Sequence, residues 1–170
     1  MFKPAEDYTC EELLRSCQEF FGGLYWAWYR AAVKVVGEEK AEEILVELSE
    51  VFAESEVEYL KSLWGKEFKT LADITPPLDV VHRMVGYDYA WTMEDNFKGY
   101  ERITRCPIHS ATPAEFKGKG PGPLCTVYCK NIGEKAYARL DSTIEVDTRL
   151  SAGDACCGFK IERRRSAHEA

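Results

Sequence analysis

Apolar and polar residues follow two different periods along the chain, and the change between them divides the sequence. From Leu13 to Val35 apolar residues return every three or four positions, which is the spacing of one face of an α-helix. The stretch from Ala41 to Leu63 repeats this spacing, with glutamates over its other face. Because the connection at Gly37 is short, the pattern predicts an antiparallel helical hairpin over roughly the first 65 residues.

Capping signals mark where the helices begin and end. Thr9 followed by Glu12 is a capping box at the start of the first helix, and Gly65 closes the second. A third, shorter helix is expected to begin at Thr75-Pro76-Pro77, because proline is tolerated in a first turn, and to end at Gly86.

Beyond Gly86 the pattern changes to short β-type segments separated by turn residues. The expected elements are strands at Tyr87–Glu94, Gly99–Arg105, Ser142–Leu150 and Cys156–Arg163, and a helix from about Pro123 to Leu140. The predicted fold class is α+β: an N-terminal helical hairpin followed by a strand–strand–helix–strand–strand unit with an antiparallel sheet. We divide the chain into a helical region at 1–86, a cysteine-containing α+β region at 87–163 and a tail at 164–170, with the two regions forming one compact domain.

Composition excludes several classes of partner. The chain has 22 basic against 29 acidic residues, a net charge of −7, which argues against binding to a nucleic-acid backbone. The longest apolar stretch, Phe20 to Val36, is interrupted by Arg30 and Lys34 and does not predict a membrane span. With no secretory signal visible at the N-terminus, a cytoplasmic location is the expectation.

Cysteines carry the chemical signal of the sequence. Five of the seven lie in the last third, at Cys106, Cys125, Cys129, Cys156 and Cys157. In a reducing compartment, clustered cysteines favour metal binding or catalysis over disulfides. Two cysteines four residues apart on a helix are too far apart for a disulfide, but their sulfurs can reach a shared metal.

The expected topology brings four of these thiols together. If the second and fourth strands are antiparallel neighbours, Cys106 and Cys157 lie at the same edge of the sheet, and the helix start carrying Cys125 and Cys129 can cover it. A four-sulfur site of this kind suits zinc or, alternatively, an iron–sulfur cluster, and His109 is a substitute or additional ligand. Simple packing of buried thiols is the competing interpretation.

The remaining candidates have more ordinary interpretations. Cys17 is assigned to the apolar core of the first helix, and Cys10 and Cys156 are left outside the site. Cys125, in a first helical turn, is expected to be the most acidic thiol. His82 is interpreted as a structural histidine, while Asp154 is either a turn residue or a carboxylate beside the thiols. The aromatic run Tyr25 to Tyr29 belongs to the core, a ligand pocket or an oligomer interface.

Three motifs resemble one known family. They are Thr-Arg-Cys-Pro at 104–107, Leu-Cys-Thr-Val-Tyr-Cys at 124–129 and Gly-Asp-Ala-Cys-Cys-Gly-Phe-Lys-Ile at 153–161. Together with the helical N-terminal half, they resemble the L-2-amino-thiazoline-4-carboxylate hydrolase-like family, which is distantly similar to 4-vinyl-reductase-type small-molecule-binding domains. The resemblance implies an activity that opens a cyclic thiazoline to an N-carbamoyl cysteine, and it leaves the substrate of this chain open.

These observations support three hypotheses. The first is a zinc- or thiol-dependent hydrolase acting on a small cyclic amide or C=N compound, with Asp154 or His109 handling protons. The second is a binding or sensor module for a small molecule, in which four cysteines close a structural metal site. The third is a domain whose cysteines only pack. No nucleic-acid or membrane partner is expected, and a homodimer through the aromatic helix face is a further hypothesis.

Overall fold

The computed structural model describes residues 9–116 and 122–165. The middle of the predicted loop between Pro113 and Pro123, and most of the predicted tail at 164–170, lie outside the described residues.

Two long helices open the fold. Helix α1 spans Cys10–Val36 and helix α2 spans Glu38–Trp64, with the chain reversing at Gly37. The predicted capping box is confirmed: the Glu12 backbone N–H donates to the Thr9 hydroxyl, and the Thr9 N–H donates to the Glu12 carboxylate at 2.7 Å. Gly65 ends α2 in the left-handed conformation, as predicted.

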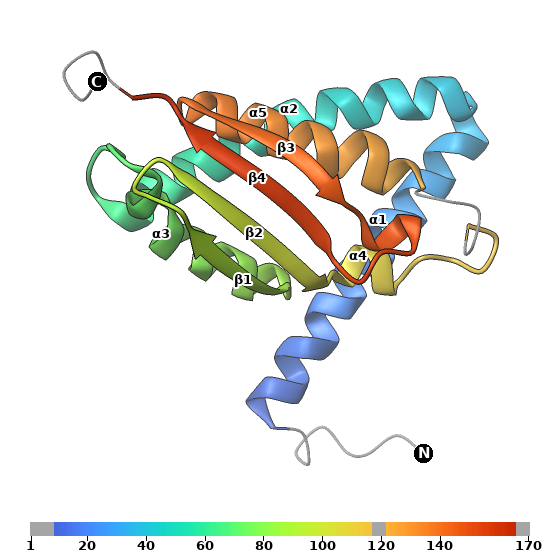
Figure 1. Cartoon of the computed structure of the whole chain (residues 1–170). Coiled ribbons are helices and arrows are strands. Elements are labelled where there is room, and N and C mark those ends of the chain that lie inside the picture. Colours follow the sequence, from blue (N-terminus) through green and yellow to red (C-terminus); the bar gives the residue numbers. More distant parts are fainter. Residues whose placement is uncertain (1–8, 117–121, 166–170) are drawn as a thin grey trace.

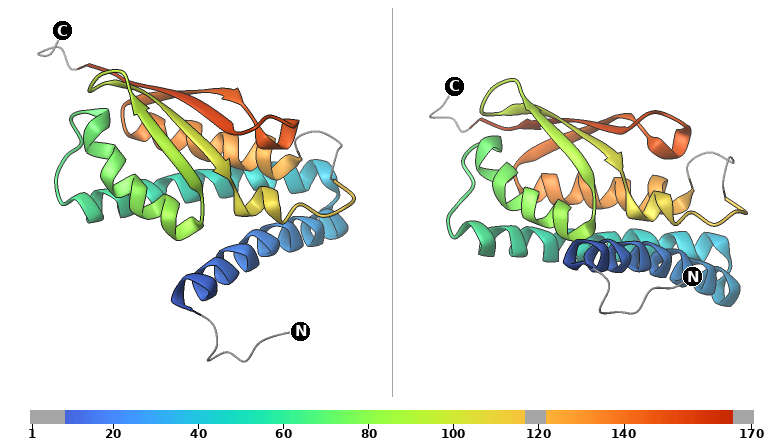
Figure 2. Two further views of the ribbon diagram at one scale, coloured as in Figure 1. Left: turned by 60° about the horizontal axis from the view of Figure 1, so that its bottom comes forward. Right: turned by 90° about the horizontal axis from the view of Figure 1, so that it is seen from below.

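The predicted core face of α1 is wrong. Phe20 is 66% exposed and Val35 83% exposed, and Cys17 is exposed instead of lying in the core. The buried positions of α1 are Gln18, Gly22, Trp26 and Tyr29, which follow a different face of the helix. The reason is visible in Figures 1 and 2, where the first turns of α1 extend away from the rest of the molecule, so the most apolar face has no partner there.

Helix α3 spans Leu71–Val85, so it begins four residues before the predicted Thr75. A second capping box, Thr70 with Asp73, starts it, and Pro76 and Pro77 fall inside the helix. The Thr75 hydroxyl donates to the Ala72 carbonyl, the acceptor that Pro76 cannot reach without an N–H. The predicted end at Gly86 is confirmed.

A four-stranded antiparallel sheet follows, in the order β1-β2-β4-β3. Its strands are β1 Asp88–Met93, β2 Lys98–Arg105, β3 Ser142–Thr148 and β4 Cys157–Arg163. The α+β fold class is therefore confirmed, and so is the pairing of β2 with β4, in which Ile103 lies opposite Cys157.

The connections between strands add elements that the sequence did not predict. A short helix α4, Pro107–Ser110, follows Cys106 directly, and a 3₁₀ turn η3, Leu150–Ala152, precedes β4. The predicted helix between Pro123 and Leu140 is present, but its first part, η2 at Leu124–Cys129, is a π-helix, and only α5 at Lys130–Arg139 is α-helical. Single π-helical turns occur often at functional sites.

Helices cover one face of the sheet, and the other face is open (Figures 1 and 2). The main core lies between α2, α3, α5 and the sheet, and includes Val57, Leu71, Ile74, Tyr137 and Ile161. A second core joins α1, α2, α4 and η2 around Trp26, Tyr29, Leu45 and Leu124, and Cys106 and Cys129 pack against it.

Helix α1 packs closely against α4 at Gly22, where the absence of a side chain leaves room for the α4 backbone. A Cβ atom on Gly22 would lie 2.5 Å from the carbonyl oxygen of Pro107, a distance that no side chain tolerates. The Trp26 indole N–H, one turn further along α1, donates to the Ile108 carbonyl at 2.9 Å. These contacts hold α4, and with it the adjacent Cys106, against α1.

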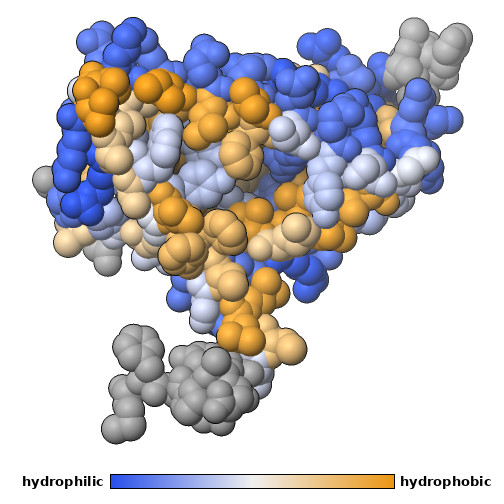
Figure 3. Space-filling model, turned by 180° about the vertical axis from the view of Figure 1, so that it is seen from behind, coloured by the Kyte–Doolittle hydropathy of each residue, from blue (hydrophilic) through white to orange (hydrophobic). Residues whose placement is uncertain are grey.

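Exposed apolar side chains concentrate on the helical side of the molecule, including the projecting part of α1 (Figure 3). On α1 they are Leu13, Leu14, Phe20, Phe21, Leu24, Trp28, Val35 and Val36. Within residues 9–116 and 122–165, none of the helices combines the length and the apolar character that crossing a membrane requires.

Candidate functional site

Four cysteines from three separate segments gather at one end of the sheet. Cys106 follows β2, Cys125 and Cys129 lie in η2, and Cys157 begins β4. Cys129 interacts electrostatically with the other three, and Cys106 interacts with Cys125 and Cys157. We call these four residues the thiol cluster. All seven cysteines of the chain are free, so no disulfide joins them.

Burial sets the protonation of the thiol cluster. It raises the pKa of Cys106 to about 12, although backbone N–H groups of His109 and Ile108 partly offset the effect. Cys129 is partly buried, and its pKa is raised well above the ordinary value by burial and then by the neighbouring thiols. These two thiols are therefore neutral at physiological pH unless a cation compensates their charge.

Cys125 is not the acidic thiol that its helical position suggested. Burial raises its pKa, and the nearby Ser151 hydroxyl and Arg149 guanidinium only partly offset the increase. Its backbone N–H is also occupied, because it donates to the Gly122 carbonyl at 2.9 Å. The pKa of Cys157 is raised too, first by burial, and the Leu150 N–H donates to its sulfur at 3.4 Å.

The thiol cluster does not form a ready-made metal centre in this structure. Within the described part of the chain, no three cysteine, histidine, aspartate or glutamate side chains are arranged to hold one metal ion. Cys156 pairs with Thr148, whose hydroxyl oxygen lies 3.7 Å from its sulfur.

The two predicted proton carriers lie beside the thiol cluster in different ways. His109 belongs to α4, and its backbone N–H faces the Cys106 sulfur. The Asp154 carboxylate accepts a 2.8 Å hydrogen bond from the Arg149 N–H, so it closes the turn before β4. This contact corresponds to the turn-residue alternative for Asp154, and the catalytic roles of both residues stay predictions.

A second polar group, which the sequence did not reveal, lies deeper between the helices and the sheet. His82 on α3 is 7% exposed and Glu101 on β2 is 3% exposed, and the His82 Nδ1 lies 2.9 Å from the Glu101 Oε1. The Glu56 carboxyl on α2 interacts with both. We call Glu56, His82 and Glu101 the acid–imidazole cluster. His82, interpreted from the sequence as structural, therefore lies beside the buried Glu101 carboxyl and within electrostatic range of the partly buried Glu56 carboxyl.

Tyrosines connect the two clusters. Tyr87 interacts electrostatically with Cys106, Cys129 and Glu56, and burial raises its pKa well above the ordinary value. Tyr128 interacts with Cys129 and Glu56, and its hydroxyl donates to the Tyr25 hydroxyl at 3.2 Å. Tyr87 and Tyr128 are therefore within electrostatic range of both clusters.

The aromatic run of α1 divides between the core and the surroundings of Tyr128. Trp26 and Tyr29 are buried core residues, with 2% and 1% exposure, whereas Tyr25 is half-buried and stacks near Tyr128 with ring centroids 5.2 Å apart. Trp28 is 38% exposed and belongs to the outer surface.

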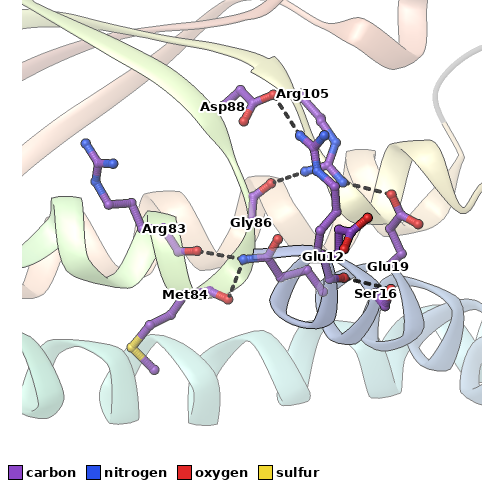
Figure 4. A network of polar contacts seen from close by, with 10 residues as sticks. Glu12, Ser16, Glu19, Arg83, Met84, Gly86, Asp88 and Arg105 are labelled. Carbon is purple, nitrogen blue, oxygen red and sulfur yellow. Dashed lines mark hydrogen bonds and ion pairs between the residues drawn. The ribbon is translucent and has the colours of Figure 1, made fainter. Parts of the chain in front are cut away.

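Polar contacts tie the projecting helix to the end of α3 and to β2 (Figure 4). The Gln18 side-chain amide donates to the Arg83 carbonyl at 2.8 Å, one of the carbonyls that a helix end leaves free. Arg105 donates to the Gly86 carbonyl at 2.9 Å and to the Glu19 carboxylate at 3.1 Å. The position of α1 relative to the sheet is therefore set by directed contacts as well as by packing.

Comparisons with known proteins give a family and a fold. The family model described as L-2-amino-thiazoline-4-carboxylic acid hydrolase matches residues 17–161. Among curated proteins, no sequence matches this chain.

Two solved structures share the fold. The phenol-responsive sensory domain of the transcription activator PoxR, solved with phenol, superimposes with a TM-score of 0.57 at 11% identity, covering 84% of this chain and 74% of that chain. A trafficking protein particle complex subunit 3 from Naegleria fowleri, covalently bound to palmitic acid, superimposes with a TM-score of 0.59 at 14% identity, covering 89% and 97% respectively. At these identities the likeness concerns the fold alone.

Proposed function

The chain belongs to the L-2-amino-thiazoline-4-carboxylic acid hydrolase family, and from this premise we propose that it is a small-molecule-binding protein with a structural metal site at its thiol cluster. Zinc is the metal proposed, because four thiolates form its commonest structural ligand set, and an iron–sulfur cluster is the alternative.

One observation supports the metal site. Thiols from three distant segments of the chain lie within electrostatic range of one another in a buried setting. Four partly buried thiols without disulfides gain little from being neighbours, whereas a bound cation would stabilise their thiolates and join the three segments.

The side-chain arrangement limits what is proposed. Since the described side chains do not form a complete ligand set, the proposal names Cys106, Cys125, Cys129 and Cys157 as the ligands and assigns the metal no catalytic step. The metal would supply folding energy to the cysteine-containing end of the sheet.

Metal analysis tests the proposal directly. We expect protein purified without added metal to contain about one equivalent of zinc, and Cys129→Ala to contain much less. Cys17→Ala is the matched control, because Cys17 is exposed on α1 and should leave the metal content unchanged. Visible absorption of the purified protein would indicate the iron–sulfur alternative. Less than about a tenth of an equivalent of zinc or iron in the unmutated protein would contradict the metal site.

Family membership favours a second candidate, hydrolysis of a small cyclic amide or C=N compound. In that case His109, beside the thiol cluster, or Asp154 would transfer protons. Incubation with L-2-amino-thiazoline-4-carboxylate tests this candidate. Loss of substrate that is reduced by His109→Ala or Asp154→Asn, and not by Cys17→Ala, would support it, and unchanged substrate would contradict it.

We also propose that the chain forms a homodimer and is located in the cytoplasm. The apolar side chains exposed on α1 would pair with a second copy of the chain, giving a homodimer. Phe20→Glu combined with Phe21→Glu should then yield a monomer in light scattering, and a monomeric unmutated protein would contradict the dimer. Seven free cysteines suit a reducing, cytoplasmic environment.

A further inference from the structure

The acid–imidazole cluster contains more carboxyl groups than basic groups. Glu56, His82 and Glu101 come from α2, α3 and β2 and meet between the helices and the sheet. Among the described residues, the charged groups that act on the Glu56 carboxyl are His82 and Glu101. Two carboxyl groups face a single imidazole, so one negative charge stays uncompensated when all three ionise.

Several polar atoms around this cluster lack a partner of good geometry. Glu101 Oε1 and His82 Nδ1 are close, at 2.9 Å, yet neither atom makes an aligned hydrogen bond to any described residue. The same holds for the Tyr89 hydroxyl, the Trp91 indole N–H and the Tyr137 hydroxyl. Buried polar atoms of this kind are rare in proteins, so several of them together call for an explanation, and a bound molecule that supplies their partners is one.

The backbone directs these atoms to one place. Trp91 lies opposite Glu101 in the β1–β2 register, so both side chains leave the same face of the sheet. The Tyr89 ring packs edge-on against the His82 ring, with centroids 4.8 Å apart. Tyr137 on α5 interacts electrostatically with both Glu101 and Glu56. The unpartnered atoms therefore surround the two carboxyl groups.

The surroundings identify the chemistry of the ligand. Carboxylates accept hydrogen bonds from N–H groups, and a cationic nitrogen would also offset the charge of the second carboxylate when both ionise. The neighbouring aromatic rings of Tyr89, Trp91 and Tyr137 favour a cation as well, through their electron-rich faces. An anionic ligand would instead meet two like charges in a buried setting.

We propose that the acid–imidazole cluster, with Tyr89, Trp91 and Tyr137, is a binding site for a small organic cation, an amine or amidine, in which Glu101 and Glu56 accept its N–H groups. This inference rests on the proposed small-molecule-binding function and names its ligand class. It does not depend on the thiol cluster holding a metal.

Calorimetric titration with benzamidine and phenol, measured separately, tests the charge of the ligand. Both probes carry one six-membered ring, but benzamidine is cationic and phenol is neutral at neutral pH. We expect benzamidine to bind and phenol to bind at least about ten-fold more weakly. Phenol binding as tightly as benzamidine, or no benzamidine binding at millimolar concentration, would overturn the cation site.

Variants locate the site. Glu101→Gln keeps the shape of the side chain and should weaken benzamidine binding at least about ten-fold. Glu145→Gln is the matched control, because it is the same change at an exposed position of the same sheet and should leave binding unchanged. If Glu101→Gln does not fold by circular dichroism, Glu56→Gln takes its place with the same expected loss. Benzamidine binding that neither variant weakens would overturn the inference.

Metal content, measured on the same samples, separates this inference from the metal proposal. Loss of benzamidine binding in Glu101→Gln with unchanged metal content supports an independent organic-cation site. Loss of metal in Glu101→Gln would contradict that independence.

Discussion

The thiol cluster and the acid–imidazole cluster lie on the same face of the sheet, but they accommodate their ionisable groups in different ways. Glu101 and Ile103 have the same parity on β2, and Cys157 lies opposite Ile103, so both clusters face the helices. The thiols are chemically alike and oppose one another's ionisation, whereas the Glu101 carboxyl has a different kind of group beside it, the His82 imidazole at 2.9 Å. The thiol cluster stays neutral by keeping its protons, and the acid–imidazole cluster pairs an acid with a base.

The largest expected difference is in the alkylation rate of the cysteines, inside and outside the thiol cluster. A thiol with a pKa of about 12 has about a thousand-fold less thiolate near neutral pH than an ordinary thiol. We therefore expect limited alkylation to modify Cys10 and Cys17 first, and Cys106 and Cys129 last. Peptide mass spectrometry over a time course measures the order. Cys106 reacting as fast as Cys17 would show that burial does not control the thiol cluster.

The next largest expected difference is in the free energy of unfolding lost when one residue of each cluster is replaced by alanine. Glu101→Ala should lower the free energy of unfolding by about 3 kcal/mol, because it leaves a buried imidazole without its partner. Cys157→Ala in metal-free protein should cost only about 1 kcal/mol. Urea denaturation measures both, with the exposed Glu145→Ala as the control. Equal losses for Glu101→Ala and Cys157→Ala would remove the distinction.

A smaller effect concerns pH. Burial raises the pKa of Glu56 above that of an unfolded glutamate, and Glu101 adds to this while His82 opposes it. The folded protein therefore holds this proton more tightly, so the contribution to stability is present below the unfolded pKa and is lost as pH rises through the folded pKa. Glu56→Gln should gain stability relative to the unmutated protein as pH rises from about 4 to 7.

Thermal denaturation across this range measures the difference, and Glu54→Gln, at an exposed position of the same helix, is the control. A difference between the Glu56→Gln and unmutated proteins that does not change with pH would contradict the raised pKa.

The smallest effect tests the link between the clusters. Tyr25→Phe removes the 3.2 Å hydrogen bond to Tyr128 and keeps the ring, so it should cost about 1 kcal/mol in the free energy of unfolding. Trp28→Phe, at a more exposed ring on the same helix, should cost less. A loss for Tyr25→Phe no larger than that for Trp28→Phe would indicate that the hydroxyl pair does not join the two regions.

The sequence predicted most of the fold because its periods and caps are local signals. Both long helices, the succession of four strands along the chain, and the ends at Gly37, Gly65 and Gly86 follow from such signals, whereas the pairing of β2 with β4 was a conditional expectation that the structure bears out. The start of α3 was wrong because the Thr70–Asp73 capping box was overlooked in favour of the prolines. The buried face of α1 was wrong because amphipathic spacing cannot say whether a partner lies against the apolar face.

The candidate site was predictable only where its residues are rare. Cysteines at strand and helix ends attract notice, and the structure brings Cys106, Cys125, Cys129 and Cys157 within electrostatic range of one another. Glu101 was missed because glutamate is common in this chain, although its place between Gly99 and Ile103 on the inward parity of β2 was a usable signal. The raised pKa of Cys125 could not be predicted, because burial depends on the packed fold.

The close contact between Gly22 and Pro107 couples the position of α1 to the segment that follows Cys106. The outer turns of the helix extend beyond the molecule, while Gly22 rests on the backbone that directly follows Cys106. No flexible side chain lies between the two backbones to absorb a displacement. A displacement of α1 at Gly22 would therefore also move the Pro107 backbone and the neighbouring Cys106.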